Sequence, residues 1–375
     1  MGTASTMACM AEALGMTLPG TAGIPAAYSR LLERSHEAGK QIVELVDAGR
    51  RPSDVMTFGS FANAIVTLSA IGGSTNFIIH LLAIAGRIGV DLTIDDFNTS
   101  ALGIPLLANL QPSGRYFMED LYYAGGIPAV MKELDKFLYK QTITVSGKPM
   151  ADNYKQAECY NRDVIASVDV PFNKLAGISV LKGNICEHGA VIKPSAATPA
   201  LMQHTGKAVV FENIDDYKSR VDDPDLEIDE TCVMVLKNVG PKGYPGMPEV
   251  GNMNIPKKLL DKGIHDMVRL SDGRMSGTGF GTVVLHVSPE AAAGGTLAVI
   301  RDGDMITLDV YRGILNVDLS DHEIAERKKQ LQLNTDMATR GYVYLYQNHV
   351  EQAHLGADLD FLKGGSGSEI HKDSH

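Results

Sequence analysis

The run Cys232-Val-Met-Val-Leu-Lys237, followed directly by Asn238-Val-Gly-Pro-Lys-Gly-Tyr-Pro-Gly-Met-Pro-Glu249, contains the two patterns on which the fold prediction depends. Its first part is short, apolar and rich in β-branched residues, which is typical of a buried strand. Its second part is rich in glycine and proline, and such segments form irregular loops. The pair therefore predicts a strand that ends in a rigid loop, with a single carboxylate at the end of the loop.

Similar short β-rich runs, divided by glycine and proline, continue through the second half of the chain. They cover residues 177–181, 208–211, 282–287, 297–300 and 305–309. Runs with this spacing are typical of a barrel or a sandwich with a few helices between the strands. Residues 299–306 also have the pattern of a hairpin, because two apolar runs flank a polar turn that contains an Asp-Gly pair.

Helical patterns occupy most of the first half of the chain. Residues 28–49 predict an amphipathic helix whose apolar face consists of Leu31, Leu32, Ile42, Leu45 and Val46. Residues 72–85 predict a second, apolar helix, and residues 119–138 predict a third that is interrupted at 125–128. Near the other end of the chain, residues 319–332 predict a charged helix with Ser320 and Glu323 as its capping box.

The sequence pattern changes from helical to β-rich near residues 155–175. We therefore expect two domains in this chain of 375 residues, 1–163 and 164–375. The formal net charge of −11 argues against nucleic acid and an anionic membrane surface as partners. No apolar run approaches the roughly 20 residues that span a bilayer, and the first residues lack the regions of a signal peptide. Four scattered cysteines favour a reducing compartment, so we expect a cytoplasmic protein.

Two loop segments have the residue types of a catalytic or metal site. The loop 238–249 can hold Glu249 in one place, as a hard Mg²⁺ site needs, although a solvated surface carboxylate gives the same pattern. The segment 270–282 contains Ser276, which can act as a nucleophile or, beside a metal, as a base. Thr278 lies two positions further on, and a simple glycine-serine turn is the alternative interpretation.

Other polar groups are weaker candidates. Ser74, Thr75 and Asn76 open a helix, where free N–H groups receive a carboxylate or phosphate, but helix capping alone also explains them. Residues 182–195 have the pattern of strand, turn and strand with basic residues at its ends, among them Lys193, which predicts solvated turns. Cys186 and His188 form one isolated Cys-x-His pair, which is a weak indication of a metal.

Taken together, these segments resemble the iron–sulfur-dependent dehydratases of the IlvD/Edd family, which act on sugar acids and dihydroxy acids. The resemblance covers nearly the whole chain and follows the family's motifs in order. The matching stretches are residues 1–7 (Met-Gly-Thr-Ala-Ser-Thr-Met), 71–76, 111–121, 124–129, 181–184, 189–197, 240–249, 271–278 and 287–291.

The resemblance implies an α/β N-terminal domain, represented here by its second half, and a β-barrel-like C-terminal domain, with the active site between them. It also implies homo-oligomers and the loss of water from a 2,3-dihydroxy acid to give a 2-keto-3-deoxy acid. In the family, Mg²⁺ grips the carboxylate end and an iron–sulfur cluster of the 2Fe-2S type acts on the C3 hydroxyl. Carried over by motif, Glu249 is a Mg²⁺ ligand and Ser276, as alkoxide, takes the C2 proton. Thr278 shapes the substrate site, to which Ser74, Thr75 and Asn76 also belong.

The sequence departs from the family pattern in its metal-binding motifs. One family cysteine runs directly into the Met-Gly-Thr-Ala of residues 1–4, and a Cys-Asp-Lys motif completes the Mg²⁺ site, but neither occurs in this chain. The four cysteines that do occur, Cys9, Cys159, Cys186 and Cys232, do not match the cluster positions. We therefore expect an N-terminally truncated enzyme with no iron–sulfur ligands, which by itself retains neither cofactor and has little or no activity.

The substrate stays open at this stage. Residues 271–282 and the chain ending, from Asp358-Leu-Asp-Phe-Leu362 to Asp373-Ser-His375, look most like the pentonate dehydratases. We therefore expect an aldonic acid such as L-arabinonate or D-xylonate as the small-molecule partner. The alternative within the family is the dihydroxy-acid dehydratase of branched-chain amino-acid biosynthesis, which needs an apolar pocket instead of hydroxyl partners. An alternative of another class is a non-catalytic remnant that serves as an interface module.

Overall fold

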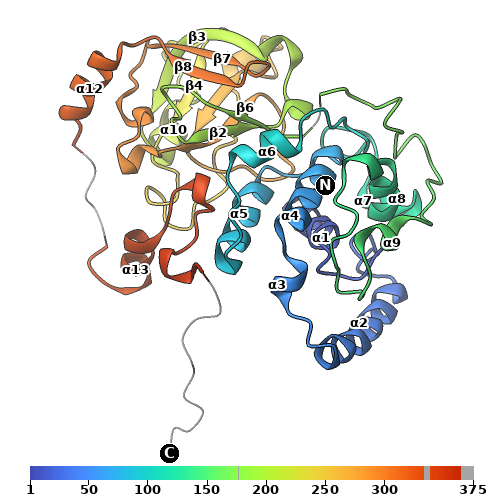
Figure 1. Cartoon of the computed structure of the whole chain (residues 1–375). Helices are drawn as coiled ribbons and strands as arrows, with labels where there is room; N and C mark the ends of the chain where they lie inside the picture. The colour runs from blue at the N-terminus through green and yellow to red at the C-terminus, as the bar shows by residue number, and fades with distance from the viewer. Residues whose placement is uncertain (176, 333–337, 365–375) are drawn as a thin grey trace, which may run out of the picture.

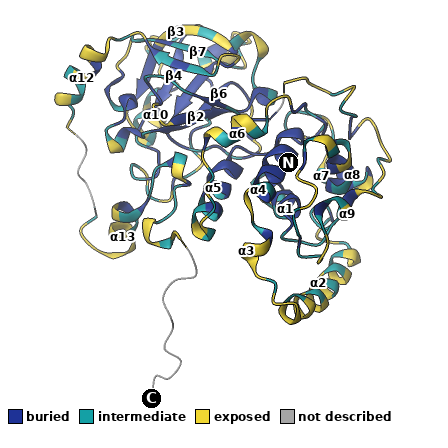
Figure 2. Ribbon diagram, in the orientation of Figure 1, coloured by how far each residue is buried: buried dark blue, intermediate teal, exposed yellow. Residues whose placement is uncertain are grey.

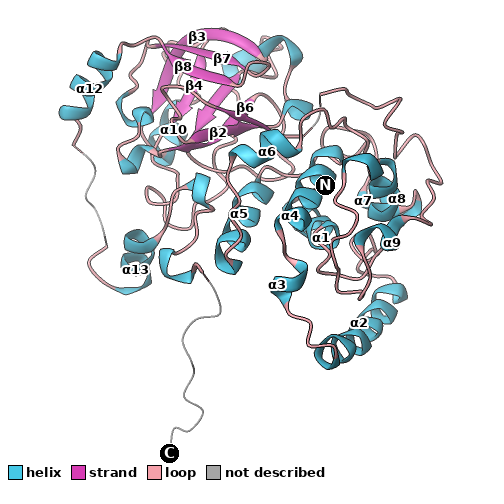
Figure 3. Ribbon diagram, in the orientation of Figure 1, coloured by secondary structure: helices cyan, strands magenta, loops and turns pink. Residues whose placement is uncertain are grey.

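In the computed structural model, which describes residues 1–175, 177–332 and 338–364, a helical region and a strand-rich region lie side by side (Figure 1). Helices dominate the first half of the chain and strands gather in the second half, as the sequence predicts (Figure 3). The division at residue 163 stays a prediction. Of the chain ending used for the substrate prediction, residues 358–362 are described, whereas Asp373-Ser-His375 lies outside the described residues.

The helical region is built around α4, which is buried from Ser60 to Ala70 and packs against α1, α6 and α8. Small residues are frequent along α4, so neighbouring helices can approach closely and bury their apolar faces. The helices of this region are α1 (Thr3–Ala13), α2 (Ser29–Asp47), α3 (Pro52–Val55), α4 (Phe58–Ala70), α5 (Asn76–Ile88), α6 (Asp95–Ser100), α7 (Met118–Tyr123), α8 (Gly126–Glu133) and α9 (Met150–Tyr154).

The three predicted helices of this region are confirmed as α2, α5 and the pair α7 and α8. The interruption between α7 and α8 occurs at Gly125, whose φ of 118° lies in the left-handed region that favours glycine. The apolar face of α2 is not buried, whereas an amphipathic helix normally packs that face against the rest of the protein. No residue of α2 is buried, and Leu32 is 74% exposed, so this helix projects from the body of the molecule (Figure 2).

The strand-rich region is one eight-stranded sheet in the order β1-β2-β6-β5-β4-β3-β7-β8. Its two edges nearly meet, because the backbone of Lys182, after β1, exchanges hydrogen bonds with Gly313 and Leu315 beside and in β8 (both 2.9 Å). The sheet is therefore a nearly closed barrel, as expected. Its strands are β1 (Ser179–Leu181), β2 (Gly189–Ile192), β3 (Gln203–Phe211), β4 (Val233–Leu236), β5 (Val268–Ser271), β6 (Val283–Ser288), β7 (Met305–Asp309) and β8 (Ile314–Val317).

Four neighbouring strands, β3, β4, β5 and β6, run parallel to one another. The carboxyl ends of parallel strands lie at the same edge of a sheet, and ligand sites of mixed folds collect outside that edge. The loops that follow β4 and β5 are the two loops that the sequence singles out, 238–249 and 272–282. The topology therefore brings Glu249 and Ser276 to one end of the barrel.

The predicted strand at residues 297–300 is wrong, and so is the hairpin that depends on it. Thr296–Val299 is a 3₁₀-helix, in which the amide of Ala298 donates to the carbonyl of Gly295 (3.0 Å). A buried apolar run of four residues fits a strand or a helical turn equally well. The charged helix is confirmed as α12 (Asp321–Lys329), and the hydroxyl of Ser320 accepts a hydrogen bond from the Glu323 amide (3.2 Å).

Three shorter helices complete the strand-rich half and the end of the described chain: α10 (Ile214–Arg220), α11 (Lys257–Leu260) and α13 (Gly341–His349). Beyond α13, the chain returns to the helical region and docks on α5. Asp358 accepts two hydrogen bonds from Arg87 (2.6 and 2.7 Å). Gly356 packs so closely on α5 that a Cβ atom there would lie 2.5 Å from the Ala83 nitrogen.

None of the helices in the described ranges combines the length and the apolar character that crossing a membrane requires.

Candidate active site

Three segments that are far apart in the sequence meet beside α5. They are the turn before α5 with Asn76, the loop 238–249 after β4, and the loop 272–282 after β5. The backbone of residues 2–3 lies against them, because a Cβ atom on Gly277 would be 2.7 Å from the Thr3 nitrogen. The predicted candidates therefore form one cluster at the boundary between the helical region and the barrel.

Asn76 is the central connection of this cluster. Its side chain is fully buried, and its Nδ2 donates to a carboxylate oxygen of Glu249 and to the carbonyl of Met275 (3.0 Å). The same nitrogen lies 2.9 Å from the hydroxyl of Thr3. One amide group thus ties the predicted metal ligand to the residue directly before Ser276.

Ser276 and Thr278 present their hydroxyl groups to each other, with 3.1 Å between Oγ and Oγ1. Ser276 is half-buried and Thr278 is exposed, so both can be reached from solvent. No histidine or carboxylate of the described residues makes a hydrogen bond to Ser276, so the described chain supplies no base partner for a hydrolase-type serine. The serine depends on a different means of activation.

The other two predicted residues of the α5 turn differ from each other in their contacts. The hydroxyl of Ser74 lies 3.1 Å from that of Thr3 and accepts a hydrogen bond from the Asn76 amide (3.3 Å). Thr75 is buried, and its hydroxyl has no hydrogen-bond partner among the described residues. Ser74 therefore contacts other residues of the cluster directly, whereas the buried hydroxyl of Thr75 makes no such contact.

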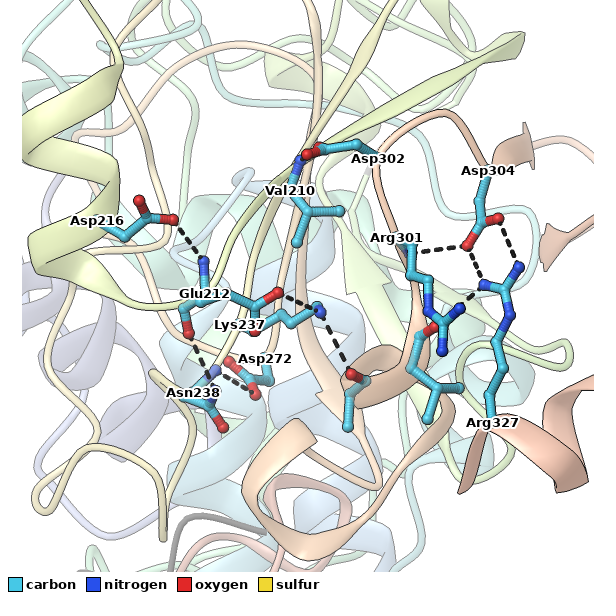
Figure 4. Close-up of polar contacts among 12 residues, drawn as sticks. Val210, Glu212, Asp216, Lys237, Asn238, Asp272, Arg301, Asp302, Asp304 and Arg327 are labelled. Carbon is cyan, nitrogen blue, oxygen red and sulfur yellow. Dashed lines mark hydrogen bonds and ion pairs between the residues drawn. The ribbon is translucent and has the colours of Figure 1, made fainter. Parts of the chain in front are cut away.

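Two buried carboxylates hold the loop that carries Glu249. Asp272 accepts from the amides of Asn238 (3.2 Å) and Val239 (3.0 Å) at the start of the loop (Figure 4). Glu290 accepts from the amides of Lys242 and Gly243 (both 3.0 Å) in its middle. Neither acid is exposed, and burial together with the charge of Glu290 raises the pKa of Asp272 to about 7.

Figure 4 also shows the base of this loop, where Lys237 pairs with Glu212 (2.8 Å) and donates to the carbonyl of Ala298 (3.2 Å). Lys237 is the last residue before the loop, and its side chain is buried. The pairing satisfies its charge in a place with little water. The start of the loop is thereby fixed to the barrel.

Arg274 fixes the far end of the same loop on both sides of Glu249. Its Nε donates to the carbonyl of Met247 (2.6 Å), and its own carbonyl accepts from the Gly251 amide (2.7 Å). Because Arg274 lies two residues before Ser276, these bonds hold the loop of Glu249 in register with the segment of Ser276. The sequence interpretation did not assign a role to Arg274, Asp272 or Glu290. Asp272 and Arg274 follow β5, a strand that the sequence did not predict, whereas Glu290 lies shortly after the predicted strand at 282–287.

The C-terminal segment contributes one more support. The side-chain amide of Gln352 donates to Glu290 (2.7 Å), and its oxygen accepts from the Glu290 backbone amide (2.8 Å). This two-point pairing keeps the Glu290 carboxylate pointed at the loop. Gln352 is thus a distant residue in the sequence that supports the position of Glu249.

Comparison with known proteins decides the family. The model of the dihydroxy-acid/6-phosphogluconate dehydratase N-terminal domain matches residues 1–153, and the model of the C-terminal domain matches residues 163–357. The chain belongs to this dehydratase family. It is 55% identical to an L-arabinonate dehydratase of Rhizobium leguminosarum bv. trifolii over 97% of this chain and 63% of that protein.

Two further relatives extend the range of substrates in this dehydratase family. The chain is 46% identical to a 6-deoxy-6-sulfo-D-gluconate dehydratase of Pseudomonas putida, over 97% of this chain and 64% of that protein. It is 41% identical to a dihydroxy-acid dehydratase of Acetivibrio thermocellus, over 96% and 65% of the two chains. The chain spans a little under two thirds of the length of these relatives.

The residues present fit the two cofactors of such dehydratases unequally. Glu249 is exposed and its Oε2 accepts no hydrogen bond from a described residue, so it can supply one ligand to Mg²⁺, which commonly keeps several waters. No three acidic, histidine or cysteine side chains in the described ranges are arranged to hold a metal. Burial raises the pKa of the Cys9 and Cys186 thiols, which disfavours the thiolates that a cluster requires. These two cysteines therefore do not fit an iron–sulfur cluster.

Proposed function

We propose that this chain supplies the base and one Mg²⁺ ligand of a sugar-acid dehydratase, which converts an aldonic acid such as L-arabinonate or D-xylonate into the 2-keto-3-deoxy acid. The observation that carries the proposal is the buried amide of Asn76, which bonds to Glu249 and to the carbonyl before Ser276. A base and a metal ligand must be held in fixed geometry to act on one substrate. The proposal includes a cytoplasmic location and a homo-oligomeric enzyme.

The chemistry removes a proton from C2 and a hydroxyl group from C3. Ser276, as alkoxide, takes the C2 proton, the electron pair forms the C2=C3 double bond, and the C3–O bond breaks. The departing hydroxide takes up one proton and leaves as water, which balances the proton that Ser276 gained from C2 once the serine returns to its alkoxide form, and the enol product becomes the 2-keto acid. Mg²⁺, when bound, supplies positive charge that stabilises the substrate carboxylate as the C2 proton leaves.

The residues of this chain have separate tasks in that reaction. Glu249 would hold the cation, and Asn76, through its bond to Glu249, orients that carboxylate. Thr278 lies within hydrogen-bond distance of Ser276 and stabilises negative charge on its oxygen. The buried acids Asp272 and Glu290 keep the loop of Glu249 rigid, so the cation site changes little when substrate arrives.

Identity to the relatives supports a sugar acid as the substrate. The chain shares 55% and 51% of its residues with proteins named for L-arabinonate and L-arabonate, and 46% with one named for a sulfogluconate. The dihydroxy-acid dehydratases are less similar, at 39–41%. A dihydroxy acid is therefore the alternative substrate, and the experiment below compares it with the sugar acids.

The test joins the chain to the part of the L-arabinonate dehydratase that it does not cover and follows formation of the 2-keto acid from L-arabinonate, D-xylonate and 2,3-dihydroxyisovalerate. We expect turnover of a pentonate, and a clear preference for 2,3-dihydroxyisovalerate overturns the substrate proposal. In the same protein, Ser276→Ala should abolish exchange of the C2 proton with solvent deuterium, measured by NMR, while substrate binding is kept. Retained exchange removes Ser276 from the role of base. Glu249→Gln should raise the Mg²⁺ concentration needed for half-maximal activity.

A further inference from the structure

Lys193 and Ser195 lie directly after β2 and face the glycine turn between α4 and α5. A Cβ atom on Gly72 would lie 3.8 Å from Cε of Lys193 and 3.6 Å from the hydroxyl of Ser195. Gly72 has a φ of +65°, a conformation that favours glycine. The absence of a side chain at Gly72 therefore leaves room for both polar groups at this turn.

Lys193 is buried without a partner. Only 4% of its surface is exposed, and no hydrogen bond or ion pair joins its ammonium group to a residue within 1–175, 177–332 or 338–364. The neighbouring hydroxyl of Ser195 is also buried and makes no hydrogen bond within those ranges. The prediction that Lys193 lies in a solvated turn is therefore wrong.

A buried ammonium group without a counter-charge is unfavourable, because it loses its hydration and gains nothing in return. Burial accordingly lowers the pKa of Lys193 to about 8. Buried lysines are usually paired with an acid. The other two buried cations of the described chain follow that rule, since Lys237 pairs with Glu212 and Arg269 with Asp266. Lys193 is the exception among them.

A series of contacts connects the turn beside Lys193 to Glu249. Gly72 is two residues before Ser74, whose hydroxyl lies 3.1 Å from Thr3, and Thr3 contacts Glu249. Burial, and after it the positive charge of Lys193, lowers the pKa of the Met1 amino group. Residues 1–3 thus connect the surroundings of Lys193 with the candidate active site.

We infer that Lys193 and Ser195 form an anion-binding position of the active site that receives the carboxylate of the sugar acid. The inference rests on the proposed function for the identity of the anion, whereas the position itself rests on the buried, unpaired pair. An ammonium and a hydroxyl group both donate hydrogen bonds, and a carboxylate accepts from both. The same contacts stabilise the additional negative charge that the carboxylate oxygens gain when the C2 proton leaves.

The test measures thermal unfolding of the 375-residue chain with increasing L-arabinonate or sodium sulfate, at constant ionic strength. We expect L-arabinonate to raise the unfolding temperature of the unchanged chain, because a ligand of the folded state stabilises it. In Lys193→Met this response should require about 10- to 100-fold more L-arabinonate, the effect of losing a hydrogen bond to a charged group. Ser195→Ala should weaken the response by about 2- to 10-fold.

A second readout separates a binding role from a structural one. If Lys193 is a buried charge awaiting an anion, Lys193→Met without ligand should unfold at the same or a higher temperature than the unchanged chain, since an unpaired charge is removed. A lower unfolding temperature without ligand overturns the inference. Lys257→Met, which removes an exposed lysine, is the matched control and should leave the response to L-arabinonate unchanged.

The two ligands distinguish failure of the position from failure of its assigned anion. A response to sulfate that depends on Lys193, with none to L-arabinonate, supports the anion-binding position and contradicts the sugar acid of the proposed function. A response to L-arabinonate that Lys193→Met leaves intact supports the proposed substrate and overturns the role of Lys193. No response to either ligand overturns the anion-binding position.

Discussion

Replacing Gly277 with alanine should loosen the contact between Ser276, Thr278 and the first residues of the chain. The added Cβ atom would lie 2.7 Å from the Thr3 nitrogen, 2.8 Å from the Gly2 carbonyl carbon and 2.9 Å from Cβ of Ser74. Two of these atoms belong to the backbone and cannot rotate away, so a segment must shift. Overpacking of this kind costs about 1–3 kcal/mol. We expect a loss of that size in the free energy of unfolding, together with weaker binding of L-arabinonate.

Urea unfolding followed by circular dichroism measures the loss, and Gly39→Ala provides the control. Gly39 lies inside the exposed helix α2 with no atom within 4 Å of an added Cβ. There the same substitution should stabilise the chain by about 0.5–1 kcal/mol, because alanine favours the helix. The reasoning is refuted if Gly277→Ala unfolds at the same urea concentration as the unchanged chain while Gly39→Ala behaves as expected.

Three more predictions concern the buried polar groups around the site. The pKa of Lys193 falls from 10.5 to about 8 in the folded chain. As the pH rises, the folded state therefore loses this proton at a lower pH than the unfolded state does. Raising the pH from about 8 to about 10.5 should therefore stabilise the unchanged chain relative to Lys193→Met by up to about 3 kcal/mol in urea unfolding; a pH-independent difference contradicts the assignment. Glu290→Gln should leave the loop amides poorly satisfied, costing about 1–3 kcal/mol and speeding hydrogen exchange of Lys242 and Gly243, whereas Gln352→Ala should cost only about 1 kcal/mol. Asn76→Ala should weaken Mg²⁺ binding, measured by calorimetry, and unchanged affinity argues against Asn76 as the residue that orients Glu249.

Much of the fold follows from local patterns in the sequence. The run 232–237 is a strand because its apolar, β-branched residues fit a buried sheet, and it becomes β4. The run 297–300 has a similar composition and is a helical turn, because four residues are too few to define a period. For α2, periodicity correctly predicts one apolar face, but it carries no information on what covers that face.

The members of the site are predictable one at a time, whereas their contacts are not. Glu249, Ser276 and Asn76 each lie in a glycine-rich segment whose composition predicts a loop or a helix start that could bind a ligand. The bond between Asn76 and Glu249 joins residues 173 positions apart, and it depends on how the start of α5 packs against the loop after β4. The prediction for Lys193 is wrong for the same reason. A basic residue beside a turn is normally solvated, but Lys193 is buried and lies against Gly72, which is distant in the sequence.

The pairing of Gln352 with Glu290 has a consequence for the order in which the site is completed during synthesis. Gln352 follows Glu249 by about a hundred residues, and Glu290 also emerges later than the loop that it holds. At about 5–20 residues per second on the ribosome, roughly 5 to 20 seconds separate translation of Glu249 from that of Gln352. During that interval the nascent loop exposes its amides to water. The last of the contacts that support the position of Glu249 therefore forms only when nearly all of the described chain has been made.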